Sequence, residues 1–376
     1  MPMERLHIAF FGPTNSGKST LVNAICGQEV SLVSPIPGTT TDPVRKLAEL
    51  PGLGPCVLID TAGLDDSGVL GAERERRTRA VIDETDVAVV LEPVPGASSP
   101  QPSVSGHQPS FSGHQPSFSG LSRESLLAAG IPYVTYTRGE SIPSLLERIA
   151  AVAPHEEERF LTGSLVKAGD LVLLVMPQDS EAPKGRLILP QVQVIRELLD
   201  RGCTPLCCTP DSLPSALEKV RPSLVITDSQ AFGMVNKTVP ADIPLTSFSI
   251  LLAGAKGDIG TFVKGAAAID SLQPGSRVLI AEACTHVPDT EDIGRVKIPN
   301  LLRKRIGNID VDIAAGNDFP EDLTPYSLIV HCGACVANAR LVRSRIRKAL
   351  LAGVPITNYG IALAKLQGIL DRVSIP

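Results

Sequence analysis

Leu6-His-Ile-Ala-Phe-Phe-Gly12-Pro-Thr-Asn-Ser-Gly17-Lys18-Ser19, near the start of this 376-residue chain, joins a mostly apolar run to a glycine-rich loop. The apolar run predicts a short buried strand, and residues 20–26 have the pattern of a helix. The loop between them is G-x-x-x-x-G-K-S, in the strand–loop–helix context that a phosphate-binding loop requires. In such a loop, backbone N–H groups surround phosphates, Lys18 reaches the outer phosphates and Ser19 holds Mg²⁺.

Two further segments complete the predicted nucleotide site. Pro37-Gly-Thr-Thr-Thr-Asp-Pro43 has the hydroxyls and the glycine of a switch loop. The strand expected at 57–59 leads to Asp60-Thr-Ala-Gly63, which offers a carboxylate to the Mg²⁺ shell and a backbone N–H to a γ-phosphate. The predicted nucleotide-binding residues are Gly12, Asn15, Ser16, Gly17, Lys18, Ser19, Thr20, Thr39, Thr40, Asp60 and Gly63, with Ser19 and Asp60 as magnesium ligands.

Together these segments resemble the translation-factor class of small GTPases, which implies a GTP hydrolase that uses Mg²⁺. Asn15 resembles the asparagine of potassium-activated members, whose side-chain carbonyl helps to hold K⁺ against the phosphates. A loop-stabilising Asx turn is the alternative role. No glutamine or histidine stands beside Asp60–Asp66 to orient a water molecule. The expected catalytic residues are therefore Lys18, Asn15 and Thr40.

The guanine-specificity element of that class is missing. After the strand expected at Val87–Leu91, an Asn-Lys-x-Asp tetrapeptide should contact the guanine edge, and no such tetrapeptide occurs. Residues 93–120 are instead a low-complexity, Pro/Ser/Gly-rich insert that cannot pack a core. A helix, a strand and a closing helix are expected again within 121–152. We therefore expect intact phosphate and Mg²⁺ contacts with weakened guanine selectivity.

Residues 154–262 predict a middle α/β domain without a second phosphate loop. Adjacent Cys207 and Cys208 would point to opposite faces of one strand, so we expect them, with Cys203, to be small buried hydrophobic residues and not metal ligands. Gly254–Gly260 predicts a flexible, turn-rich passage before the last domain. Strands are expected at 171–176, 205–208 and 224–227, and helices at 189–201 and 213–220.

Residues 263–376 predict a third, mostly parallel α/β domain with sulfur and nitrogen ligands at its strand ends. Strands expected at 277–283 and 327–330 lead into Ala-Cys284-Thr-His286 and Val-His331-Cys332-Gly-Ala-Cys335. Because parallel strands present their carboxyl ends at one edge, we expect three thiols and two imidazoles at one rim. The basic helix expected at 337–353 should lower the pKa of the nearby thiols. Further helices are expected at 262–272, 298–306 and 360–370, and strands at 311–315 and 354–357.

These ligands leave two metal centres open on chemistry alone. Three soft thiolates suit an iron–sulfur cluster whose fourth position falls to histidine, water or a partner's ligand. A structural Cys3His or Cys2His2 zinc site is the equal alternative. A redox-active dithiol would leave the other cysteine and histidine residues unexplained.

Composition argues against several other functions. The chain is 43% hydrophobic, enough for large cores, but only 3% aromatic with no Trp, which disfavours stacking of single-stranded nucleic acid. Its net charge of −5 gives no general attraction to nucleic acid or anionic membranes. Eight unevenly spaced cysteines do not predict a disulfide framework. No signal peptide or membrane span is evident, so we expect a cytoplasmic protein.

The order of these segments resembles the FeFe-hydrogenase maturation GTPase family HydF over nearly the whole chain except 93–120. Besides the phosphate loop and the cysteine pattern, the resemblance rests on Ala182-Pro-Lys-Gly-Arg186, Thr227-Asp-Ser-Gln-Ala-Phe232 and Pro355-Ile-Thr-Asn-Tyr-Gly360. The resemblance implies a P-loop GTPase domain (1–153), a dimerisation domain (154–262) and a cluster domain (263–376). It also implies a 4Fe–4S cluster on Cys284, Cys332 and Cys335, with His286 or His331 at the exchangeable fourth iron.

A HydF-like role would make the chain a scaffold. It would hold a two-iron precursor with CO, cyanide and a dithiolate bridge, made by radical-SAM enzymes, and pass it to apo FeFe-hydrogenase. The GTPase would act as a switch, and the middle domain would form a homodimer. Two alternatives are a tRNA- or ribosome-associated GTPase with a structural zinc module, and a cluster carrier whose nucleotide module is vestigial.

Overall fold

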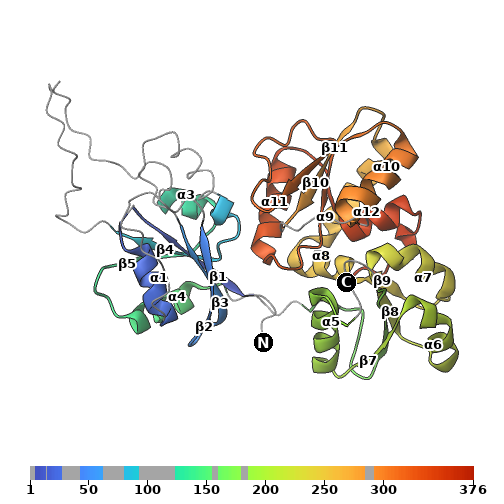
Figure 1. The fold of residues 1–376 in the computed structure, drawn as a ribbon, viewed down its shortest axis with the longest axis horizontal. Helices are drawn as coiled ribbons and strands as arrows, with labels where there is room; N and C mark the ends of the chain where they lie inside the picture. The colour runs from blue at the N-terminus through green and yellow to red at the C-terminus, as the bar shows by residue number, and fades with distance from the viewer. Residues whose placement is uncertain are drawn as a thin grey trace. The chain divides into compact units, whose positions relative to one another are not determined.

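The computed structural model describes residues 5–13, 15–27, 43–61, 80–92, 123–154, 160–178, 185–283 and 292–376. The chain divides into two compact units, Met1–Glu156 and Glu157–Pro376 (Figure 1). The first unit holds a five-stranded sheet, and the second holds two four-stranded sheets. The predicted class, a P-loop α/β domain followed by smaller α/β parts with mostly parallel sheets, is confirmed. The boundaries expected near 153 and 262 stay predictions.

The first unit is a mostly parallel sheet with strand order β2-β3-β1-β4-β5, in which only β2 is antiparallel to its neighbour. Side chains of β1 alternate between two cores, as strand geometry requires. Ile8 and Phe10 pack with α1 and α4, and Ala9 and Phe11 pack on the α3 face. The elements are β1 (Leu6–Phe11), α1 (Lys18–Cys26), β2 (Val44–Leu50), β3 (Gly54–Asp60), β4 (Val87–Leu91), α3 (Arg123–Ala128), β5 (Tyr133–Tyr136) and α4 (Ile142–Val152).

The second unit begins with a parallel sheet of order β7-β6-β8-β9. Residues on the two faces of this sheet belong to two different core clusters, so helices cover both faces. Its elements are β6 (Leu171–Val175), α5 (Leu189–Asp200), β7 (Thr204–Cys208), α6 (Leu213–Lys219), β8 (Leu224–Thr227), α7 (Phe232–Thr238), β9 (Leu245–Ser247) and α8 (Phe248–Lys256), with a 3-10 turn at Ser229–Ala231.

The last sheet is also parallel and has the order β11-β10-β12-β13. A π-helical turn at Ile293–Lys297 leads into α10, and a 3-10 turn at Ala267–Ser271 follows α9. The elements are α9 (Ile259–Ala266), β10 (Arg277–Glu282), α10 (Ile298–Ile306), β11 (Asp310–Ala315), β12 (Leu328–His331), α11 (Ala339–Leu351), β13 (Ile356–Asn358) and α12 (Tyr359–Leu366).

The two sheets of the second unit are an internal duplication. In both, the first strand lies between the second and the third, and the fourth is at the edge. Matching positions also share sequence. Gly185-Arg-Leu-Ile-Leu-Pro190 corresponds to Gly294-Arg-Val-Lys-Ile-Pro299, and Pro244-Leu-Thr-Ser-Phe-Ser-Ile250 corresponds to Pro355-Ile-Thr-Asn-Tyr-Gly-Ile361. We call the two halves the middle lobe and the cysteine lobe, after Cys332 and Cys335.

The lobes pack on each other reciprocally. One core cluster runs through both, from Val225 to Ile329. A Cβ at Gly333 would lie 3.5 Å from Ser249 Oγ at the start of α8, and a Cβ at Gly360, at the start of α12, would lie 3.1 Å from Ser229 Oγ. The first helical turn after the last strand of each lobe therefore contacts the loop after the third strand of the other.

Several local expectations were wrong. The passage Gly254–Gly260, expected to be flexible, is the end of α8 and the start of α9, because Asp258 caps α9 through its side chain. The helix expected at 262–272 starts earlier, at Ile259, and ends at Ala266. Cys203 is buried and Cys208 packs against the core, as expected, but Cys207 is exposed on the edge strand β7. Strands β2 and β9 and helices α7 and α8 were not predicted.

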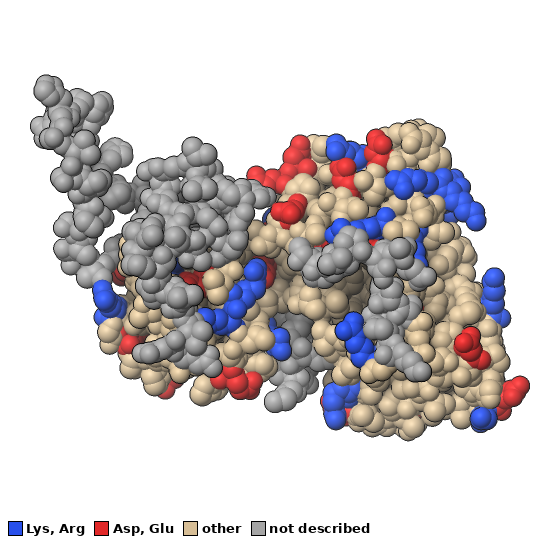
Figure 2. All heavy atoms as spheres, viewed as in Figure 1, with Lys and Arg blue, Asp and Glu red and all other residues tan. Residues whose placement is uncertain are grey.

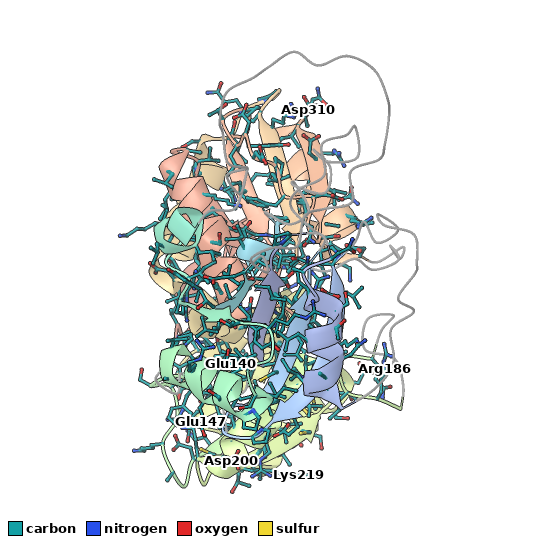
Figure 3. All side chains as sticks on the ribbon, turned by 90° about the vertical axis from the view of Figure 1, so that its left-hand side faces the viewer. Glu140, Glu147, Arg186, Asp200, Lys219 and Asp310 are labelled. Carbon is teal, nitrogen blue, oxygen red and sulfur yellow. The ribbon has the colours of Figure 1, made fainter. Side chains whose placement is uncertain are left out.

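Charged side chains are mixed in sign over the coloured surface in Figure 2. Glu147, Arg186, Asp200, Lys219 and Asp310 are exposed at the periphery of their units (Figure 3). Within the described ranges, none of the helices has the length and apolar character needed to cross a lipid bilayer.

Candidate functional site

The phosphate-binding loop has the backbone conformation that its glycines allow. Gly17 has φ 94°, and Asn15 adopts the left-handed region with φ 61°. A Cβ at Gly12 would meet Leu91 O at 3.0 Å, so only glycine fits there without displacing β4. Lys18 is 6% exposed and its Nζ donates to Gly12 O at 3.0 Å and Pro13 O at 2.7 Å. These carbonyls hold the ammonium inside the loop, where a phosphate would meet it.

Ser19 and Asp60 meet at the entrance to α1. Ser19 Oγ donates to Asp60 Oδ2 at 2.5 Å, whereas Asp60 Oδ1 is buried without a hydrogen-bond partner. Burial raises the pKa of Asp60 above its ordinary value, against opposing contributions from Ser19 and Lys18. A hydroxyl beside a carboxylate oxygen without a partner is a donor set that fits Mg²⁺.

The described loop residues Gly12, Asn15, Ser16, Gly17, Lys18 and Ser19 lie together with Asp60 at the carboxyl ends of β1 and β3. Thr20 is on α1 and exposed. The predicted contacts Thr39, Thr40 and Gly63 lie outside the described residues, so their roles stay predictions.

Cys332 lies at the carboxyl rim of the cysteine lobe. In the strand register His331 pairs with Ala281 and with Asn358, so Cys332 follows the point where β10, β12 and β13 end together. Its Sγ accepts backbone N–H groups of Ala283 at 3.1 Å and of Ala334 at 3.4 Å. Two amide donors directed at one sulfur favour its thiolate form.

The expected lowering of the pKa of this thiol is wrong. Burial raises the pKa of Cys332 above its ordinary value, and the bonds from Ala283 and Ala334 oppose this effect only in part. Helix α11 starts at Ala339 with Asn338 as its N-cap, several residues beyond Cys335. A metal ion must therefore displace the proton of the Cys332 thiol, which lowers metal affinity as the pH falls.

His331 is buried and uses both ring nitrogens. Its Nε2 lies 3.2 Å from Arg345 Nη1, which can only donate, so Nε2 accepts and the proton is on Nδ1. Nδ1 donates to Cys332 O at 2.8 Å. Burial, and then the charge of Arg345, lower the pKa of His331 to about 3, so the ring is neutral. To ligate a metal, His331 would have to give up one of these two bonds.

Arg345 is 2% exposed and ties three segments of the rim together. Besides His331, it donates to Glu282 O at the end of β10 and to Gly316 O after β11. Its guanidinium also lies 4.9 Å from the centre of the Phe319 ring, within cation–π range. This arginine was not predicted from the sequence, where it was one of several basic residues on an amphipathic helix.

Lys256, the last residue of α8, holds the loop that carries the second cysteine. It is 5% exposed, and its Nζ donates to Ala334 O at 2.8 Å, Cys335 O at 3.4 Å and Ala337 O at 2.7 Å. Ala334 has φ 51°, a left-handed conformation that non-glycine residues rarely adopt. A cation on the middle lobe thus stabilises a strained turn on the cysteine lobe.

Cys284 and His286 lie outside the described residues. Of the five predicted iron ligands, the structure describes His331, Cys332 and Cys335, and the two cysteines pack against different core clusters, Cys332 against that of Tyr359 and Cys335 against that of Phe248. Over the described ranges, no group of three or more His, Cys, Asp or Glu side chains is arranged to hold a metal ion. The three-cysteine site stays a prediction.

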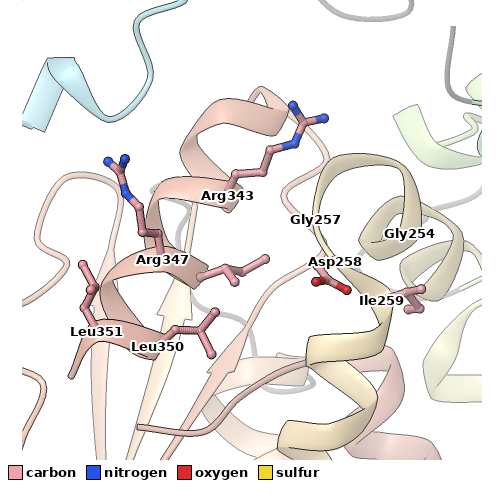
Figure 4. Close-up of a pocket in the computed structure, with 9 residues that line it drawn as sticks. Gly254, Gly257, Asp258, Ile259, Arg343, Arg347, Leu350 and Leu351 are labelled. Atoms are coloured by element: carbon pink, nitrogen blue, oxygen red, sulfur yellow. The ribbon is translucent and has the colours of Figure 1, made fainter. Parts of the chain in front are cut away.

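A groove of about 650 Å³ lies between α11 and the α8–α9 turn (Figure 4). Its one carboxylate, Asp258, caps α9 by accepting Thr261 N at 3.1 Å. Arg343 and Arg347 stand on α11, and Leu350 and Leu351 of the same helix are exposed. The groove thus offers positive charge and apolar surface, but none of the cysteine ligands described above.

Comparison with protein families matches three stretches of the chain. Residues 7–106 match a model described as 50S ribosome-binding GTPase, residues 161–257 match the hydrogen maturase F dimerization domain, and residues 260–376 match the hydrogen maturase F tetramerization domain. The last two together cover more than half of the chain. The nucleotide unit is therefore a GTPase domain, and the remainder consists of oligomerisation domains.

The MnmE proteins that resemble this chain match only its GTPase module. The tRNA modification GTPase MnmE of Methylobacterium sp. (strain 4-46) is 39% identical over 156 residues, which are 40% of this chain and 34% of that protein. MnmE of Xanthomonas oryzae pv. oryzae (strain MAFF 311018) is 41% identical over 87 residues, 23% of this chain and 19% of that protein. The chain thus spans about a third or less of these relatives. A structure of Aquifex aeolicus Era bound to GDP.AlF4⁻ aligns over 85% of this chain and 97% of that one, at 14% identity and a TM-score of 0.28.

Proposed function

Because this chain belongs to the hydrogen maturase F (HydF) family, a family of hydrogenase maturation GTPases, we propose that it holds a 4Fe–4S cluster on Cys284, Cys332 and Cys335. On that cluster it would carry the two-iron subcluster of FeFe-hydrogenase. Radical-SAM enzymes would supply this cargo, and apo FeFe-hydrogenase would receive it. GTP with Mg²⁺ binds the first unit, and its hydrolysis would regulate the release of partners.

The observation that carries the cluster proposal is the environment of Cys332 Sγ. One of its two amide donors is Ala283 N, and Ala283 immediately precedes Cys284 in the chain. A residue that binds the sulfur of Cys332 is thus the sequence neighbour of another predicted ligand. Amide N–H groups directed at sulfur are the usual way in which a protein stabilises an anionic iron–sulfur centre. The buried cations Lys256 and Arg345 bind the backbone of the same rim.

The fourth iron position would be the exchangeable one. His331 already gives both ring nitrogens to Arg345 and Cys332 O, so His286 is the better of the two predicted histidine ligands. A weakly held ligand would let a bridging group of the cargo bind that iron and leave again. A fourth cysteine would bind more tightly and would slow that exchange.

Anaerobic reconstitution tests the cluster. The protein incubated with iron and sulfide should contain about four irons per chain, absorb broadly near 400 nm and give a 4Fe–4S electron paramagnetic resonance signal on reduction. Cys332→Ala should lose most of the iron, whereas Cys207→Ala, the matched change at an exposed cysteine, should retain it. A colourless protein with stoichiometric zinc after the same treatment would refute the proposal.

The nucleotide unit would use K⁺ in place of a missing water-orienting side chain. Asn15 is exposed in a left-handed turn of the loop, which leaves its side chain available for a cation beside the phosphates. GTP turnover should be faster in KCl than in NaCl, and Lys18→Ala should abolish it. Equal, weak turnover of GTP and ATP in both salts would indicate instead that the module is vestigial.

The alternative of a tRNA- or ribosome-associated GTPase with a zinc module draws only on the first unit. The MnmE similarity is confined to that part, whereas residues 161–376 match the hydrogen maturase domains. Salt-sensitive retention of tRNA in a filter-binding assay at two salt concentrations would favour this alternative. No retention is expected.

We propose that the chain forms a homodimer through its middle lobe.

A further inference from the structure

Tyr359 brings a buried hydroxyl to the cysteine rim without a hydrogen-bond partner. It is 8% exposed, and its Oη has no partner in the structure. An unpartnered hydroxyl in such a place costs about 1–3 kcal/mol. Burial raises its pKa well above the ordinary value, so it keeps its proton and is a donor. A buried donor of this kind requires an acceptor.

The strand register places Tyr359 beside Cys332, one of the proposed cluster ligands. Asn358 pairs with His331, so Tyr359 and Cys332 leave the ends of neighbouring parallel strands at the same level. Tyr359 belongs to a buried cluster of side chains against which the partly buried Cys332 packs. On its other side, Oη lies against Gly294, where a Cβ would come within 1.9 Å of it. Gly294 belongs to the turn that follows the segment bearing Cys284. The hydroxyl therefore lies against the π-helical turn of the same lobe in which Cys332 follows β12.

The duplication supplies an internal comparison. The residue that corresponds to Tyr359 in the middle lobe is Phe248, which is buried at 2% exposure at the start of α8. Each follows the last residue of a strand, Ser247 in one lobe and Asn358 in the other, whose side chain is the N-cap of the next helix. The middle-lobe loop that corresponds to Cys332–Cys335 is Asp228–Ala231, and it has no cysteine. The hydroxyl is thus present only in the lobe that carries the predicted cluster ligands, and the same fold accepts phenylalanine at the corresponding position.

We infer that Tyr359 is a positioning residue that donates a hydrogen bond to the sulfur of the cluster held on Cys284, Cys332 and Cys335. This inference rests on the proposed cluster and adds a residue that tunes it. A hydrogen bond to cluster sulfur stabilises the more negative, reduced state and raises the reduction potential. Tyr359 therefore sets the potential of the cluster while leaving its ligation unchanged.

The test compares reconstituted full-length protein with Tyr359→Phe. Iron and sulfide contents should be equal, while the equilibrium constant for one-electron reduction should fall roughly three- to tenfold in the variant. At 59 mV per tenfold change, this is a shift of about 30–60 mV to lower potential in a titration followed by electron paramagnetic resonance. After exchange into D2O, a deuteron coupling of the reduced wild-type cluster should be missing from the variant.

Tyr326→Phe is the matched control, because Tyr326 Oη donates to Asp312 Oδ2 at 2.9 Å on β11. It should leave both the potential and the deuteron coupling unchanged. If Tyr359→Phe does not retain iron, 3-fluorotyrosine at position 359, a stronger donor, should shift the potential upward. A fully loaded Tyr359→Phe protein with the wild-type potential and coupling, or a fluorotyrosine protein with no shift, would overturn the inference. Wild-type protein without a cluster would instead refute the proposed function.

Discussion

Replacing Lys256 with glutamine should weaken cluster binding although Lys256 lies in the middle lobe and is not a ligand. Its ammonium is buried and donates to three backbone carbonyls of the loop that carries Cys335. The duplication suggests glutamine as the substitute, because Gln367 occupies the corresponding position after α12. Gln367 Oε1 lies 2.9 Å from where a Cβ of Gly233 would be, at the start of α7, which matches the segment around Ala337. A neutral amide thus lies against the first turn of α7 in the middle lobe, whereas a cation binds the cysteine-bearing loop.

The magnitude follows from the hydrogen bonds. Bonds from a charged donor contribute about 1.5–3 kcal/mol each, and glutamine can replace one of the two short ones, to Ala334 O and Ala337 O. The loss of the other bond and of the weaker one to Cys335 O should cost ~2–4 kcal/mol of loop stability. Because Ala334 is already strained at φ 51°, we expect the loop to leave this conformation. Cluster affinity should then fall at least about tenfold.

The assay is iron retention against a chelator, with amide hydrogen exchange of 332–338 measured on the metal-free protein. Lys256→Gln should lose iron faster and show faster exchange in this loop than wild type. Lys264→Gln is the control, because Lys264 is exposed on the adjacent helix α9 and should have no effect. If Lys256→Gln retains iron like wild type and its loop exchanges at the same rate, the buried lysine does not support the cysteine loop.

Three further predictions concern single side chains. Asp60→Asn should abolish Mg²⁺-dependent GTP turnover yet stabilise the nucleotide-free unit by about 1 kcal/mol at pH 7. Because folding raises the pKa of Asp60, the wild-type native state loses stability as the pH rises from the ordinary pKa of this carboxyl to its raised pKa. Thermal unfolding from pH 4 to 8 should therefore show a higher melting temperature for Asp60→Asn than for wild type only above that interval. Gly294→Ala should lower the unfolding free energy by about 1–3 kcal/mol, because its Cβ would overlap Tyr359 Oη, and a wild-type denaturation midpoint would contradict this packing. Arg345→Met should cost about 3–5 kcal/mol by leaving Glu282 O, Gly316 O and His331 Nε2 without their donor, and urea unfolding should detect that loss.

The sequence predicted the parts of the fold whose patterns are local. Strands β4 and β8 and helix α10 have the predicted bounds, because their apolar runs or faces end at clear breaks. Strand β2 was missed because it is an edge strand that exposes Leu47 and pairs antiparallel with β3. Helix α8 was missed because its apolar residues contact both lobes, so it lacks the one-sided pattern of a surface helix.

The residues that support the site were the hardest to predict. Lys256 acts through hydrogen bonds across 78 to 81 residues of sequence, Arg345 across 14 to 63 residues, and Tyr359 across neighbouring strands, and no local motif reports such contacts. One signal was available: aligning Pro244–Ile250 with Pro355–Ile361 shows the duplication and, with it, the change from phenylalanine to tyrosine. The ligand cysteines were easier to single out, because their spacing is itself a motif.

The interlocking of the two lobes has a practical consequence for any fragment of the protein. A piece cut at the boundary of the last family match, starting at residue 260, would retain Cys284, Cys332 and Cys335 but would lack Lys256. In such a piece the C-terminal residues would also lose their partner, because Ser374 N donates to Leu245 O and Val373 forms a β-bridge with the same residue of β9. Recombinant pieces meant to isolate iron chemistry should therefore begin before Leu161, so that the middle lobe, which has none of the predicted ligands, stays attached to the cysteine lobe, which has them.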